Sequence, residues 1–192
     1  MPTSSLNALV ARLESVEALD GPGRAASRTV RGLISDGAPK DVLSGAWLGH
    51  ALHPIMTDIP IGAWTSSVLL DWMGGRDSRS ASERLILAGV LAAGATFATG
   101  WSDWADAEQR SAAVRRSGLV HAAANGTATW LMISSYAARK RGAHGRGKLL
   151  SLAGSAALGA GGWLGGHLSY TLGAGITAGA PAAGMPATSG VG

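Results

Sequence analysis

Four of the five histidines in this chain are spaced to meet at one end of a helical bundle. His50 and His53 precede one apolar stretch, His121 lies near the start of a third, and His167 follows a fourth. If these stretches run up and down, all four side chains share one end. Imidazoles bind metals and carry protons near neutral pH. Their convergence therefore indicates a binding or proton-transfer site.

Three kinds of site fit these residue types. His53, His121 and His167 can ligate haem iron axially, as imidazoles do in bundle cytochromes. A divalent metal such as Zn, Fe or Cu can instead be held by a larger set, namely His50, His53, Asp58, His121 and His167. The third kind is a proton relay or a pocket for a small polar ligand. The structural alternative is that these groups only cap helix ends and pair with one another.

Four further side chains are expected to support the site: Asp103, Trp101, Trp104 and Tyr170. Asp103 can accept a hydrogen bond from a ligating imidazole and so fix its tautomer. Trp101 and Trp104 suit an aromatic belt at the level of lipid headgroups.

The composition favours packed membrane helices. The 192 residues are 46% hydrophobic and 15% charged, whereas soluble domains average about 25% charged. The absence of cysteine excludes disulfides, thiolate metal sites and Cys-ligated iron–sulfur clusters. Basic residues do not alternate with aromatic ones, which argues against a nucleic-acid partner and leaves the lipid bilayer as the expected one.

The chain is expected to divide into an amphipathic N-terminal segment (1–45), a four-helix membrane domain (46–170) and a disordered Gly/Ala/Pro tail (171–192). The N-terminal segment is predicted to hold helices over 6–20 and 27–35.

Four apolar stretches, 55–73, 85–101, 118–137 and 149–166, are each long enough to cross a hydrocarbon core of about 30 Å. The alternative is a soluble bundle, but soluble helices normally carry a charged outer stripe, and the second and fourth stretches contain no charged residue.

Basic residues in the connections predict the orientation of the bundle. Eight of them follow the first and third stretches, and three follow the second. Because cytoplasmic loops carry the excess of Lys and Arg, the first and third connections are expected in the cytoplasm. The histidines would then lie on the exoplasmic face.

The segment from Gly49 to Trp64, which reads GHALHPIMTDIPIGAW, resembles the signature of an uncharacterised bacterial family of predicted four-helix membrane proteins. Three downstream segments, at residues 70–71, 100–104 and 165–168, are similar to the family pattern, although Ala51 stands where a proline is expected. The resemblance implies a multi-pass protein of the bacterial cell membrane. Similar domains precede Rieske iron–sulfur domains, which suggests electron transfer with a separate Rieske-type or other redox protein.

These observations together predict an all-α, four-helix transmembrane bundle with an amphipathic N-terminal helix. The leading functional hypothesis is a membrane subunit that binds haem b or a divalent metal and is associated with electron transfer. The alternatives are a scaffold that docks a partner and a small proton or solute transporter. No nucleophile–base motif or nucleotide-binding loop indicates an enzyme.

Overall fold

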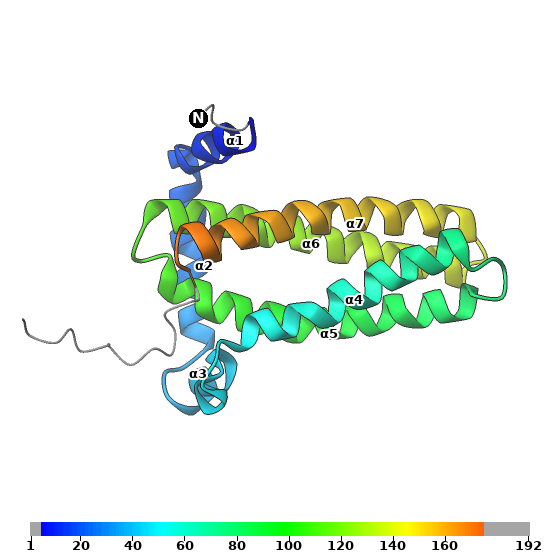
Figure 1. Cartoon of the computed structure of the whole chain (residues 1–192). Helices are drawn as coiled ribbons and strands as arrows, with labels where there is room; N and C mark the ends of the chain where they lie inside the picture. The colour runs from blue at the N-terminus through cyan, green and yellow to red at the C-terminus, as the bar shows by residue number, and fades with distance from the viewer. Residues whose placement is uncertain (1–4, 175–192) are drawn as a thin grey trace, which may run out of the picture.

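The computed structural model describes residues 5–174, and within this range the chain forms helices and no strands. The all-α prediction is therefore confirmed for this part of the chain. Four long helices lie side by side (Figure 1), namely α4 (Leu52–Met73), α5 (Arg79–Ala107), α6 (Ala112–Lys140) and α7 (His144–Gly166). A π-helical turn, η3 (His167–Thr171), extends α7. Most of the predicted tail, residues 175–192, lies outside the described residues.

The bundle consists of two helical hairpins. Helix α4 packs most closely on α5, and α6 on α7, whereas the contacts of α5 with α6 and of α4 with α7 are sparser. The neighbour order around the bundle is therefore α4, α5, α6, α7. Helices α4 and α6 lie diagonally across the bundle axis, as do α5 and α7. Side chains on diagonal helices can thus meet at the axis, between the hairpins.

The middle of the bundle is filled by a small apolar core of Trp64, Ile86, Ala93 and Met132. The Trp64 indole N–H donates to the carbonyl oxygen of Ile86 at 3.2 Å. Gly89 makes this possible, because a Cβ at that position would lie 2.3 Å from the indole nitrogen. Small residues therefore set how closely the two helices of a hairpin approach.

A buried ion pair ties all four helices together at the end of the bundle that holds the two hairpin turns. Asp71 of α4 and Arg139 of α6 are 4% and 2% exposed, and Arg139 Nη1 donates to Asp71 Oδ1 at 2.7 Å. Ser82 of α5 donates to the same carboxylate oxygen at 2.8 Å, and Ser151 of α7 lies within 3.3 Å of the other. Each helix contributes one side chain to this network.

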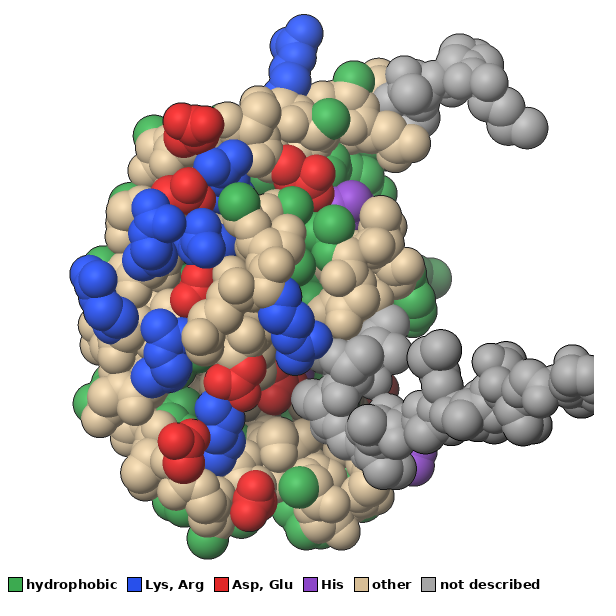
Figure 2. All heavy atoms as spheres, turned by 90° about the vertical axis from the view of Figure 1, so that its left-hand side faces the viewer, with side chains coloured by type: hydrophobic (Ala, Val, Ile, Leu, Met, Phe, Trp, Pro, Cys, Tyr) green, Lys and Arg blue, Asp and Glu red, His purple; other side chains and the backbone are tan. Residues whose placement is uncertain are grey.

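The other end of the bundle is covered by an N-terminal cap, residues 5–48. The cap comprises α1 (Ser5–Glu14), η1 (Glu17–Leu19), α2 (Asp20–Leu33), α3 (Ala38–Ser44) and η2 (Ala46–Leu48). Helix α2 crosses the ends of the long helices (Figure 1). Basic and acidic side chains are interspersed on the face that the cap presents (Figure 2).

The cap differs from its predicted form at one place. The segment Asp20-Gly21-Pro22 begins α2, whereas the sequence predicted that it ends the helix over 6–20. Proline is tolerated there because the first turn of a helix needs no backbone N–H donor. Gly23 is required by packing, since a Cβ would lie 2.7 Å from Cγ of Arg115. A Gly-Pro-Gly segment can thus belong to a helix when a neighbour leaves room only for glycine.

Ion pairs hold the cap on the bundle. Asp20 accepts hydrogen bonds from Arg116 at 2.8 Å and Arg115 at 3.1 Å, and Glu108 accepts from Arg31 at 3.3 Å. Lys40 lies 2.6 Å from Asp106. The Arg116 hydrogen bond, followed by that of Arg115, holds the pKa of Asp20 well below its usual range.

We expect the cap to loosen in acid. A carboxylate whose pKa is depressed by folding stabilises the folded state above its unfolded pKa of about 3.9, and this stabilisation is lost as the pH falls through the folded pKa. Amide hydrogen exchange of α2, corrected for intrinsic rates, should therefore accelerate below about pH 4. Asp20→Asn should accelerate it already at pH 7, and the exposed neighbour Glu17→Gln should not. Equal exchange in both variants would contradict the role of Asp20.

One of the four predicted spanning helices stands out by length and composition. Within the described residues, only α5 is both long enough and apolar enough to qualify by itself as a membrane span. The other three long helices are less hydrophobic because each combines Gly and Ala with polar side chains, such as Asp71 in α4 and Asn125 in α6. Their outward faces nevertheless expose large apolar side chains, including Leu69, Trp72, Leu91, Trp130, Ile133, Leu149 and Leu152.

Candidate functional site

A cavity of about 480 Å³ lies between the four long helices, in the half of the bundle nearest the cap. His53 and His121 enter it from the diagonal helices α4 and α6. Its remaining wall is largely apolar and glycine-rich, with aromatic side chains from α5. Volumes of about 300–1,000 Å³ with few convergent polar groups are typical of small-molecule and cofactor sites. We call it the histidine cavity.

The ring of His53 is oriented by the backbone of α5. Its Nδ1 lies 3.0 Å from the carbonyl oxygen of Thr96 and 3.1 Å from the hydroxyl of Thr99. A carbonyl oxygen only accepts, so Nδ1 carries the proton and Nε2 keeps its lone pair. The ring packs directly on Gly100, where a Cβ would lie 2.6 Å from Cε1.

The ring of His121 is oriented in the same way by α7. Its Nδ1 lies 2.8 Å from the carbonyl oxygen of Gly161, which again leaves the lone pair on Nε2. The ring packs on Gly165, where a Cβ would lie 2.9 Å from Cε1. The amide nitrogen of Asn125 is 3.3 Å from Nε2 and donates to the His121 carbonyl oxygen at 2.9 Å.

The structure does not bring the other predicted ligands into the histidine cavity. His167 Nε2 lies 2.8 Å from Glu14 Oε1 of the cap, and its ring stacks on Trp163 at a centroid distance of 6.5 Å. His50 is exposed, with Nδ1 3.4 Å from the carbonyl oxygen of Leu48. Asp58 is also exposed. It follows His53 by five residues, which places it about 140° around the helix.

The predicted five-residue metal set therefore does not form one cluster. Among residues 5–174, no group of three or more His, Asp and Glu side chains is placed to hold a metal ion. The two imidazoles that the structure does bring to one cavity are those of His53 and His121.

The four side chains predicted to support the site all line the histidine cavity, namely Trp101, Asp103, Trp104 and Tyr170. Trp101 and Trp104 pack edge to face with ring centroids 5.1 Å apart. Gly118 leaves room for Trp104, because a Cβ there would lie 2.1 Å from the indole nitrogen. Tyr170 is 88% exposed and so stands at the rim.

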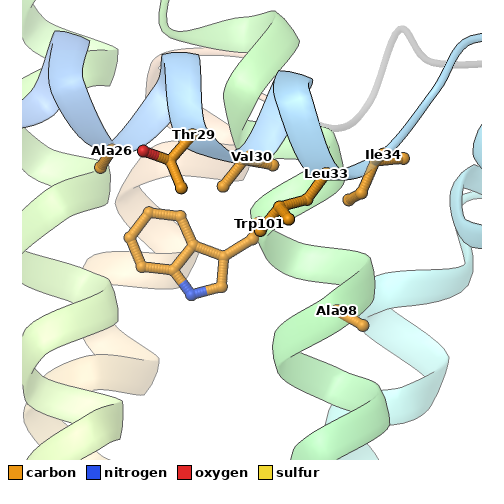
Figure 3. A pocket seen from close by; sticks show the side chains of 7 residues that line it. All are labelled: Ala26, Thr29, Val30, Leu33, Ile34, Ala98 and Trp101. Carbon is orange, nitrogen blue, oxygen red and sulfur yellow. The ribbon is translucent and has the colours of Figure 1, made fainter.

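Trp101 also separates the cavity from an apolar groove of about 390 Å³ under the cap. Val30, Leu33 and Ile34 of α2 form one wall of this groove (Figure 3). Ala98 and Trp101 of α5 form the other, and Trp101 is the only side chain that lines both hollows. The cap thus completes the apolar surroundings of the site.

Sequence reasoning missed the groups that orient the two imidazoles. Thr96 and Gly161 act through backbone carbonyl oxygens, which carry no residue-specific signal. Gly161 and Gly165 were interpreted as a small-residue pair for close helix packing, which they are, but the partners they approach are the side chains of Asn125 and His121. A signal was present in the spacing of the histidines from later inward-facing residues, and it is described below.

A family model described as "Predicted membrane protein (DUF2231)" matches residues 49–178. The chain belongs to this family. No curated protein and no solved structure matches it. The DUF2231 match begins at Gly49, just before α4, and includes all four long helices and both cavity histidines. The cap helices α1 to α3 lie outside it. Membership supports a membrane location, and the DUF2231 description specifies no activity or cofactor.

Proposed function

We propose that this chain is an integral membrane protein whose bundle holds a redox cofactor, either haem or a metal ion, through His53 and His121. It would serve as a non-enzymatic subunit in electron transfer. The observation that carries the proposal is the pair of hydrogen bonds from Nδ1 to backbone carbonyl oxygens. Histidines that bind metals usually donate their second ring N–H to such an acceptor, which fixes the ring and the tautomer.

The proposal that all four long helices span the bilayer rests on their length, their inward polar groups and the family. The shortest, α4, has 22 residues and is about 33 Å long, which suffices for a hydrocarbon core of about 30 Å. The charged side chains of Asp71 and Arg139 face each other inside the bundle, as ionisable groups in membranes normally do. The exposed apolar side chains would contact lipid.

Absorption spectra and metal analysis of the protein purified in mild detergent test the proposal. We expect a haem spectrum or a stoichiometric metal. His53→Ala and His121→Ala should each lower cofactor content at least about tenfold, because each removes one of two direct ligands. His50→Ala and His144→Ala are matched controls outside the cavity and should retain it. Folded wild-type protein with neither haem nor metal would overturn the proposal.

A further inference from the structure

The two hairpins repeat one packing pattern. The buried inward-facing positions of α4 recur in α6, each 68 residues later: Pro60 and Ala128, Trp64 and Met132, Ser67 and Ser135, Asp71 and Arg139. His53 and His121 are separated by the same 68 residues. Positions of α5 recur in α7 after 65 residues: Ser82 and Gly147, Ile86 and Ser151, Gly89 and Gly154.

The contacts within the hairpins repeat as well. Gly89 approaches Trp64, and its counterpart Gly154 approaches Met132, the counterpart of Trp64. At the cavity, Gly100 and Gly165 are also 65 residues apart, and they approach His53 and His121 respectively. The carbonyl oxygens that accept from the two imidazoles, those of Thr96 and Gly161, are again 65 residues apart.

These equivalences define a local two-fold axis along the bundle. Both hairpins run in the same direction and lie side by side, so a half-turn about the bundle axis superimposes the pattern of one on the other, as in transporters with parallel repeats (Figure 1). His53 and His121 are therefore at equal depth, on diagonal helices, on opposite sides of the axis.

The Asp71–Arg139 ion pair shows that this geometry directs paired side chains towards each other. Asp71 and Arg139 meet across the axis. His53 precedes Asp71 by 18 residues, and His121 precedes Arg139 by 18. Eighteen residues are about five complete helical turns, so each histidine projects from the same face of its helix as its charged counterpart. The two imidazoles consequently approach the axis from opposite sides.

We infer that the histidine cavity accepts a planar, haem-type metal macrocycle whose two axial positions are both filled by imidazole, from His53 and His121. This inference rests on the proposed function and narrows it to one class of cofactor. The macrocycle supplies four equatorial nitrogens, so two axial ligands complete the metal. A bare zinc ion would need four ligands, and residues 5–174 bring no third group to the pair.

The wall of the cavity supports a flat ligand. Gly100 and Gly165 place no side chain beside the imidazoles. Trp64, Phe97 and Leu158 supply apolar surface. A ring perpendicular to the line between the histidines would lie along the bundle axis, between the two hairpins where packing is sparsest.

Electron paramagnetic resonance of the oxidised full-length protein, expressed with a haem precursor, tests this inference. We expect one low-spin haem per chain, because two imidazoles give a strong six-coordinate field. His53→Ala and His121→Ala should each convert it to a high-spin, five-coordinate form or release it. The His50→Ala spectrum should be unchanged.

A second pair of variants keeps the test decisive if the alanine variants do not fold. His53→Met and His121→Met replace one axial imidazole by a thioether, which raises the reduction potential of haem. The local two-fold axis predicts similar shifts for both. Stoichiometric non-haem metal in folded wild-type protein would overturn the macrocycle and leave the proposed function standing. Folded protein without any cofactor would overturn both, and a high-spin haem in the wild type would overturn bis-histidine ligation alone.

Discussion

Replacing Arg139 alone should destabilise the bundle by about 3–5 kcal/mol, because the substitution leaves the carboxylate of Asp71 buried without its cation. We expect this loss for Arg139→Met in chemical unfolding of the detergent-solubilised protein. Asp71 is 4% exposed, and Arg139 is its bidentate partner, through hydrogen bonds from both terminal nitrogens. Lys148 donates to the backbone carbonyl oxygen of Asp71 and so does not replace Arg139 at the carboxylate.

Removal of both charges should be less harmful than removal of one. In Asp71→Leu/Arg139→Met no uncompensated charge remains, and paired replacement of buried ions by apolar residues is often close to neutral. The coupling energy of the double-mutant cycle should therefore lie in the range of about 0.5–3 kcal/mol. Lys140→Met is the matched control on the same helix, since Lys140 is exposed, and it should change stability by less than about 0.5 kcal/mol. Additive losses from the two single variants would show that the charges are not coupled.

The position of this ion pair explains how the bundle keeps a cavity at its other end. Asp71, Ser82, Arg139 and Ser151 tie all four helices together near the hairpin turns. The cap fixes the opposite end through Asp20 and Glu108. Between these two constraints the hairpins are held apart around His53 and His121. The volume of the cavity is thus maintained from both ends and does not depend on a bound molecule.

The sequence predicted the helices, the four-part order and the shared end of the histidines because these follow from local apolar stretches and up-and-down threading. It did not separate His53 and His121 from the others, because that depends on helix phase and on distant contacts. Asp58 points away from His53 by the geometry of one helix. The partner of His167, Glu14, lies 153 residues earlier in a cap that had no predicted position on the bundle.

The internal repeat was also difficult to find in the sequence. Most equivalent residues differ in type, as Trp64 differs from Met132 and Asp71 from Arg139, because each hairpin carries one half of a complementary contact. Only the inward positions repeat, and they become recognisable when burial is known. The membrane assignment has a similar origin. Apart from α5, the helices are only moderately apolar, and the DUF2231 match supplies what their composition does not.

Gly100→Ala and Gly165→Ala should each impair the site, although alanine is the better helix former. A Cβ on Gly100 would lie 2.6 Å from Cε1 of His53, and a Cβ on Gly165 would lie 2.9 Å from Cε1 of His121. Each ring would have to move away from the carbonyl oxygen that orients it. We expect a loss of about 1–3 kcal/mol in unfolding free energy from overpacking. Cofactor content should fall about 10–100-fold, as it does when groups that orient ligands are disturbed.

Gly94→Ala and Gly159→Ala are the matched controls, because they place the same methyl group on α5 and α7 where no atom lies within 4 Å. They should leave cofactor content unchanged and stabilise the helices by up to about 1 kcal/mol, the helix propensity gained by replacing glycine with alanine. If all four variants behaved alike, the glycines beside the imidazoles would matter only as weak helix formers. The local two-fold axis makes a stricter demand, since the Gly100 and Gly165 variants should impair the site equally. A large effect of one and none of the other would show that the two histidines are not equivalent ligands.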